Sequence, residues 1–132
     1  MDTPKEKKSL ARVGIRIKSD ALDTSDVTRI VGVQPTRAVR KGEQPLDRSV
    51  PSLSGIWTYS IASDDISNAA VDVLSTIEPV IAQLREAATK YGAELTVSIF
   101  WQPEGGQGGY SLPADVMRRL SMLGERIDFY FA

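Results

Sequence analysis

The stretch Glu94–Gln102, with the sequence ELTVSIFWQ, decides the fold, because it has the alternating pattern of a β-strand with two unlike faces. The side chains on one face are apolar, namely Leu95, Val97, Ile99 and Trp101. On the other face Thr96 and Ser98 are polar, and Phe100 is the one apolar exception. Strands of a doubly wound parallel sheet are apolar on both faces, so this alternation indicates a sheet that is covered on one side only.

Three further stretches, 11–18, 55–62 and 126–131, alternate in the same way. Aromatic side chains in these strands share the phase of the aliphatic ones, so we expect them to pack in the core. They are Trp57, Tyr59, Phe129 and Phe131, together with Trp101. The polar faces are predicted to form one open surface, which carries Arg12, Arg16, Thr58, Ser98, Phe100, Asp128 and Tyr130.

Helical patterns lie between these strands. A short helix over 23–31 begins at the capping residue Asp23. A longer pattern over 64–92 contains Pro79, which removes a backbone donor and predicts a break in the helix at that point. Ser111 is expected to cap a third helix before the last strand.

These elements predict an α+β fold: a single mixed or antiparallel sheet of four to five strands with helices packed on one face. The arrangement is broadly ferredoxin-like with an extra helix and strand. Residues 36–41 are compatible with a short edge strand beside the strand 55–62. We expect residues 1–9 to be a flexible tail and residues 10–132 to form a single domain.

Composition excludes several classes of chemistry. The chain has 16 basic and 17 acidic residues, so its net charge of -1 argues against binding to nucleic acid or to an anionic membrane. It contains no cysteine and no histidine, which excludes disulfides, thiolate or Ser-His catalysis and the commonest metal ligands. We therefore expect a cytoplasmic protein without a catalytic residue, a metal or a cofactor, and no stretch reads as a transmembrane span.

Several short motifs are similar to a bacterial family, the domain-of-unknown-function family 4279 (DUF4279). They comprise Asp20, Leu22-Asp23, Gly32-Val33-Gln34-Pro35-Thr36, Arg40-Lys41-Gly42, Gly55-Ile56-Trp57 and Ile127-Asp128-Phe129-Tyr130. The resemblance covers residues 11–131 and implies a single α+β domain. It implies no activity that could be assigned to any residue.

Two sets of residues are candidates for binding. The first is the basic cluster Thr36, Arg37, Arg40 and Lys41 in the irregular stretch 34–53, where guanidinium groups could hold a carboxylate or phosphate. The alternative is a solvated loop whose charges pair with nearby acids. The second set is Arg16, Phe100 and Tyr130 on the polar sheet face, which has the mixed aromatic and charged composition of an interface.

Two other motifs have simpler interpretations. The glycine-rich stretch 104–109 follows a strand, as a phosphate-binding loop would, but it contains no lysine. We therefore interpret it as a flexible loop that connects two elements. Asp64 and Asp65 stand at the start of a helix, where acidic residues act as caps and oppose the helix dipole.

The leading hypothesis is a non-enzymatic protein-interaction module, immunity-like in size and charge, that uses its polar sheet face and the basic 36–48 loop. The rival hypothesis is a small anionic-ligand-binding protein or enzyme with its site at Arg37, Arg40 and Lys41. A third possibility is a symmetric homodimer formed through the polar face.

Overall fold

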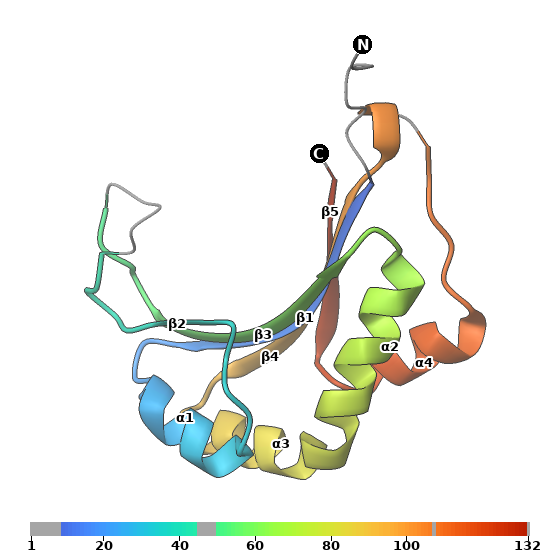
Figure 1. Cartoon of the computed structure of the whole chain (residues 1–132). Coiled ribbons are helices and arrows are strands. Elements are labelled where there is room, and N and C mark those ends of the chain that lie inside the picture. Colours follow the sequence, from blue (N-terminus) through green and yellow to red (C-terminus); the bar gives the residue numbers. More distant parts are fainter. Residues whose placement is uncertain (1–8, 45–49, 107, 132) are drawn as a thin grey trace.

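A computed structural model of the chain describes residues 9–44, 50–106 and 108–131 (Figure 1). Its single sheet has the strand order β2-β3-β1-β4-β5. The strands are β1 Leu10–Ser19, β2 Arg37–Val39, β3 Gly55–Ser63, β4 Glu94–Gln102 and β5 Arg126–Phe131. Neighbouring strands are antiparallel except for β4 and β5, which are parallel. The predicted mixed sheet and the edge strand within 36–41 are confirmed, whereas the predicted tail lies almost entirely outside the described residues.

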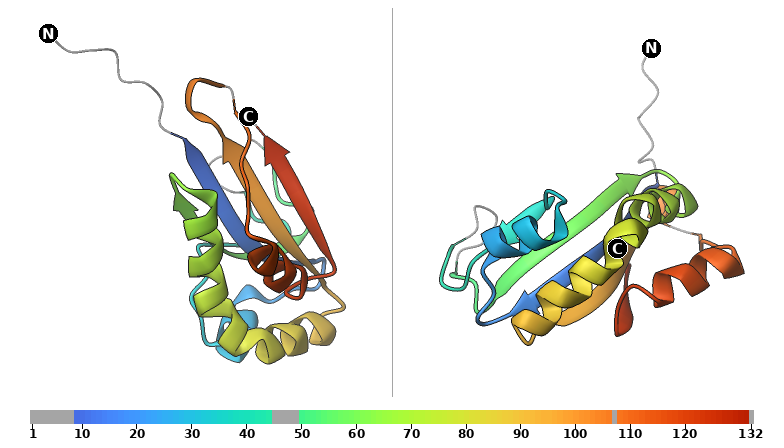
Figure 2. Two further views of the ribbon diagram at one scale, coloured as in Figure 1. Left: turned by 90° about the vertical axis from the view of Figure 1, so that its right-hand side faces the viewer. Right: turned by 90° about the horizontal axis from the view of Figure 1, so that it is seen from below.

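Helices cover one face of this sheet and leave the other open (Figures 1 and 2). They are α1 Thr24–Val31, α2 Ile66–Ile77, α3 Ile81–Lys90 and α4 Ala114–Ser121, with 3-10 turns at Glu78–Val80 and Glu104–Gly106. The break predicted at Pro79 is the first of these turns, and it separates α2 from α3. No helix in the described part of the chain is long and apolar enough to cross a membrane.

The predicted capping residues are observed at α1 and α2 but not at α4. The Asp23 carboxylate accepts a hydrogen bond from Ser25 N at 3.0 Å, and the Asp65 carboxylate accepts one from Asn68 N at 3.1 Å. The expectation that Ser111 caps α4 is wrong, because Pro113 occupies the cap position and makes no side-chain hydrogen bond there. The carbonyl of Ser111 instead accepts a hydrogen bond from the Ser67 hydroxyl.

The core lies between the sheet and the helices. Trp57 is fully buried, and its indole Nε1 donates to Thr28 Oγ1 on α1 at 3.0 Å. The expectation that Phe129 and Phe131 are core residues is wrong, since their exposed fractions are 43% and 66%. They have the predicted phase, but β5 is the edge strand, so the helices and the neighbouring strand cover these side chains only in part.

The open face of the sheet is concave, because the strands bend away from the helices (Figure 1). Gly14 lies on this face, where side chains of adjacent strands crowd together. A Cβ atom at Gly14 would lie 2.7 Å from the Cβ of Ser60 and 2.9 Å from the carbonyl oxygen of Tyr59. The close approach of β1 and β3 therefore requires a residue without a side chain at this position.

Asp26 ties α1 to the end of α3. Its carboxylate accepts hydrogen bonds from Lys90 Nζ at 2.6 Å, from the Tyr91 hydroxyl at 2.5 Å and from Arg29 Nη2 at 2.6 Å. These donors, Lys90 first, hold the pKa of Asp26 well below its ordinary value of 3.8. The same contact raises the pKa of Tyr91 to about 12.

We expect the stability that Asp26 provides to disappear in acid. Its folded pKa is lower than its unfolded pKa, so the carboxylate stabilises the fold above the unfolded value of 3.8 and ceases to do so as the pH falls through the folded pKa. Urea unfolding of wild type and Asp26→Asn between about pH 7 and pH 3 measures this, and the advantage of wild type should shrink toward the acid end. An advantage that is independent of pH would contradict the assignment.

Candidate interaction surface on the concave sheet face

Residues on the concave face form rows across the strands, because strand pairing fixes which side chains stand opposite each other. The longest row runs over all five strands in the order Arg37, Thr58, Arg16, Thr96 and Arg126. Three arginines thus alternate with two threonines. Thr96 is only 2% exposed, so the row is closely packed between the arginines of β1 and β5.

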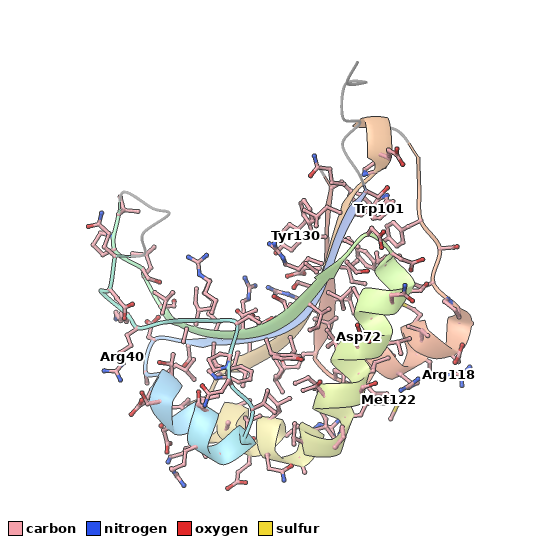
Figure 3. The ribbon with its side chains drawn as sticks, viewed as in Figure 1. Arg40, Asp72, Trp101, Arg118, Met122 and Tyr130 are labelled. Carbon is pink, nitrogen blue, oxygen red and sulfur yellow. The ribbon has the colours of Figure 1, made fainter. Side chains whose placement is uncertain are left out.

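A second row brings the aromatic residues to the same surface. Arg12 on β1 pairs with Phe100 on β4, which in turn pairs with Tyr130 on β5. Tyr130 is 46% exposed and lies on the concave side of the sheet (Figure 3). The surface that the alternation predicted is therefore assembled as expected, and Arg16, Phe100 and Tyr130 belong to it.

A hollow of 410 Å³ lies at the β2 and β3 end of this surface. It is lined by Arg12, Thr36, Arg37, Thr58, Ser60 and Ala62. Thr36 fixes one wall, since its hydroxyl accepts from Ser60 N at 3.0 Å and donates to the carbonyl of Thr58 at 3.1 Å. Two guanidinium groups and the hydroxyls of Thr58 and Ser60 line this hollow, and they are donors suited to a carboxylate or a phosphate.

The opposite end of the surface carries acidic residues that neutralise its arginines. Arg126 lies 2.9 Å from the carboxylate of Glu94 and 3.2 Å from that of Asp128, measured from nitrogen to oxygen. Arg16 lies 3.9 Å from Asp128. Within the described part of the chain no acidic side chain pairs with Arg12. Arg12, at the hollow, is therefore not neutralised by an acidic side chain of the described residues, unlike Arg16 and Arg126.

The structure does not bring the predicted basic cluster together at one place, because only Arg37 lies in β2, and Arg40 and Lys41 follow the end of the strand. Arg37 faces the hollow, whereas Arg40 turns toward α1 and donates to Ser25 Oγ at 3.0 Å (Figure 3). Lys41 Nζ lies 3.8 Å from the carboxylate of Asp20. The rest of the predicted 36–48 loop, from residue 45 on, lies outside the described residues.

The other candidate motifs make no site in the described residues. Asp65 is the cap of α2, and no group of three or more metal-ligating side chains occurs in residues 9–44, 50–106 and 108–131. A hollow of 230 Å³ beside Asp64 and Asp65 is lined by the Trp101 and Tyr110 rings, without a basic residue. These features do not change the preference for the concave face.

Comparison with protein-family models gives one match, the domain of unknown function DUF4279, over residues 9–131. The chain belongs to the DUF4279 family. The match covers the whole sheet and all four helices, so the concave face and the hollow lie within the DUF4279 domain. No curated protein and no solved structure matches the chain.

Arg12 and Thr58 line the hollow, and the sequence pattern placed both on the polar face without indicating either as a binding residue. Alternation along β1 predicts the face on which Arg12 lies. Whether Arg12 lines the same hollow as Arg37 depends on how β1, β3 and β2 are paired. Pairing register is a property of three segments far apart in the DUF4279 sequence, and no local pattern contains it.

Proposed function

We propose that the protein is a non-enzymatic binding module that takes an acidic segment of a partner protein on its concave sheet face. The observation that carries the proposal is the hollow in which Arg12 and Arg37 stand beside the hydroxyls of Thr58 and Ser60. A partner carboxylate placed there would meet charge-assisted donors, which are about twice as strong as neutral ones. The rest of the face would contribute contact area.

Local charge supports an acidic partner even though the whole chain has a net charge of -1. On its strands the concave face carries five basic side chains, Arg12, Arg16, Lys18, Arg37 and Arg126, and two acidic ones, Glu94 and Asp128. Both acids lie at the β4 and β5 end. Complementary charge of this kind steers a partner to one face and fixes its orientation.

The aromatic row supports a protein partner over a free small anion. Phe100 and Tyr130 stand beside Arg12 across β1, β4 and β5, so apolar area and charge occur on one surface. Aromatic residues and arginine are the types enriched at protein interfaces, and they carry most of the binding energy there. A small anion would use the hollow and leave Phe100 and Tyr130 without a contact.

Charge reversal at the hollow tests the proposal. The probe is a fluorescein-labelled poly-glutamate peptide, with poly-lysine as the opposite-charge control, measured by anisotropy at low and at physiological salt. We expect Arg12→Glu to weaken poly-glutamate binding by roughly tenfold to a hundredfold, the range of one lost charge-assisted hydrogen bond. Arg118→Glu is the matched control, because Arg118 is exposed on α4, on the other side of the sheet (Figure 3).

Three outcomes decide between the hypotheses. Loss of binding in Arg12→Glu with retention in Arg118→Glu supports the proposal. Equal loss in both variants would mean that only net charge matters, and it would contradict a site at the hollow. Absence of poly-glutamate binding in wild type would reject the acidic-partner proposal.

The second candidate function is binding of a free small anion in the same hollow. The hydroxyls of Thr58 and Ser60 favour it, because they could donate to anion oxygens that the two guanidinium groups do not reach. Citrate and inorganic phosphate are the probes, and a rise in melting temperature that Arg37→Glu removes would favour this candidate. Unchanged melting temperatures would leave the acidic segment as the better occupant.

A further inference from the structure

The edge strand β5 exposes three consecutive aromatic side chains. Phe129, Tyr130 and Phe131 have exposed fractions of 43%, 46% and 66%. β5 pairs with β4 on one side only, because it is the last strand of the order β2-β3-β1-β4-β5. Its outer backbone donors and acceptors therefore have no strand partner within the described residues.

The two edges of the sheet are protected to different degrees. β2 is a strand of three residues, too short to offer a long ladder to another strand. β5 has six residues and contains no proline or glycine. Its two charged residues, Arg126 and Asp128, lie in its first half, and its last three residues carry aromatic rings. Natural sheets avoid long, regular, apolar edges because such edges pair with other strands, so an exposed one indicates a contact surface.

We propose that β5 pairs with β5 of a second copy, antiparallel, about a two-fold axis at Phe129. A two-fold axis at the edge of a sheet joins identical strands with identical exposed surfaces. Two-fold symmetry is the commonest symmetry of soluble oligomers. The proposal does not rest on the function proposed for the concave face, although Tyr130 and Asp128 belong to both surfaces. Its axis lies at the edge of the sheet, whereas the homodimer considered above would form through the polar face.

The register follows from side-chain faces and charge. Residues that stand opposite each other in a sheet share a face, so the axis passes through one residue of β5. An axis at Asp128 would set two carboxylates against each other, which is unfavourable. An axis at Ile127 would leave Phe131 beyond the partner strand, and an axis at Tyr130 would leave Ile127 beyond it.

With the axis at Phe129 the pairing buries all three aromatic residues without opposing like charges. Phe129 meets Phe129 of the second copy, and Ile127 meets Phe131 of that copy on the helix side of the sheet. On the concave side Asp128 meets Tyr130 of the second copy, whose hydroxyl can donate to the carboxylate. Aromatic and branched pairs of this kind stabilise a sheet by about 0.2 to 1 kcal/mol each.

The assembly would have a definite consequence for the concave faces. Because paired residues share a face, the two-fold axis is perpendicular to the sheet, and both concave faces point to the same side. The two hollows would then be available together to one acidic partner or to two. Simultaneous engagement raises overall affinity without any new contact.

Light scattering after size-exclusion chromatography is the first test. We expect wild type to have twice the chain mass of 14.4 kDa at about 100 μM or above, and Phe129→Glu to have the mass of a single chain, because two carboxylates would meet at the axis. Val71→Glu is the matched control, since Val71 is 41% exposed on α2 and should leave the dimer intact. Circular dichroism of both variants shows whether they fold.

A single cysteine gives a second, independent measurement. The chain contains no cysteine, so Phe129→Cys introduces one thiol, which meets its copy across the axis. Opposed residues in an antiparallel pair have Cα atoms about 4.5 or 5.5 Å apart, within the range of a disulfide. Mild oxidation should give a disulfide-linked dimer of Phe129→Cys, and Val71→Cys should remain largely monomeric.

The results that overturn the proposal are equally definite. A wild-type mass of one chain over the whole concentration range would reject the dimer. Equal oxidation of Phe129→Cys and Val71→Cys would show that the thiols meet by random collision. A dimer that survives Phe129→Glu but is lost in Arg16→Glu would place the interface on the concave face instead of the edge.

Discussion

Trp57→Ala is expected to lower the free energy of unfolding by about 3 to 5 kcal/mol, the range for loss of a large aromatic residue from a core. Trp57 is 0% exposed, and on β3 it is paired with Ala38 of β2 and with Ile17 of β1. Truncation would leave a cavity under α1, because the surrounding side chains relax only in part. A domain with a stability of about 5 to 15 kcal/mol would then be close to unfolding at room temperature.

The hydrogen bond of the indole adds a second cost. Nε1 of Trp57 donates to Thr28 Oγ1, and the Thr28 hydroxyl donates in turn to the carbonyl of Thr24. Trp57→Phe retains most of the apolar volume and removes only this donor, so we expect it to cost less than Trp57→Ala, by roughly half or more. The difference between the two variants separates packing from hydrogen bonding.

Urea unfolding followed by circular dichroism measures these changes, since removal of Trp57 alters the fluorescence signal. Val71→Ala is the control, because an exposed position on α2 should change stability by less than about 0.5 kcal/mol. If Trp57→Ala cost no more than this control, the central place of Trp57 in the core would be disproved.

Local pattern was sufficient for the elements of this fold. Alternation over residues 94–102 gave the strand β4 at its observed bounds, and Pro79 gave the break between α2 and α3. The same alternation gave the one-sided sheet, because a polar face cannot be buried without partners. These features depend on neighbouring residues only, so a single sequence contains them.

The pairing of strands determines which side chains are exposed and which lie together, and the local sequence pattern could not predict this. Phe129 and Phe131 point to the same side of the sheet as the core residues. They are nevertheless exposed, because β5 is the last strand in the order of the sheet. Arg37 and Arg40 are close in sequence, yet Arg37 lines the hollow from β2, whereas Arg40 follows the end of that strand and donates to Ser25 on α1. The hollow itself is lined by Arg12 from β1 and Arg37 from β2, which come from the two strands on either side of β3.

Gly14→Val is expected to lower the free energy of unfolding by about 1 to 3 kcal/mol, as overpacking does. A Cβ atom at Gly14 would lie 2.7 Å from Ser60 Cβ and 2.9 Å from the carbonyl oxygen of Tyr59. The second contact is with backbone, so β1 and β3 must move apart. Gly14→Ala should have the same effect at the lower end of the range.

Two variants show whether crowding is the cause. Gly109→Ala is the matched control, because no atom lies within 4 Å of a Cβ atom there and the cost should be small. Ser60→Gly combined with Gly14→Ala should recover part of the loss, since it removes one contact and leaves the carbonyl of Tyr59 in place. Additive losses in the double variant would contradict direct contact between these residues.

The position of Gly14 links this prediction to binding. It stands between Arg12 and Arg16 along β1 and beside Ser60, which lines the hollow. Separation of β1 from β3 would therefore move Arg12 away from the hydroxyls of Thr58 and Ser60. We expect Gly14→Ala to weaken poly-glutamate binding even at temperatures where the variant is fully folded, whereas Gly109→Ala should bind as wild type does. Unchanged affinity in folded Gly14→Ala would mean that binding does not depend on the close approach of β1 and β3.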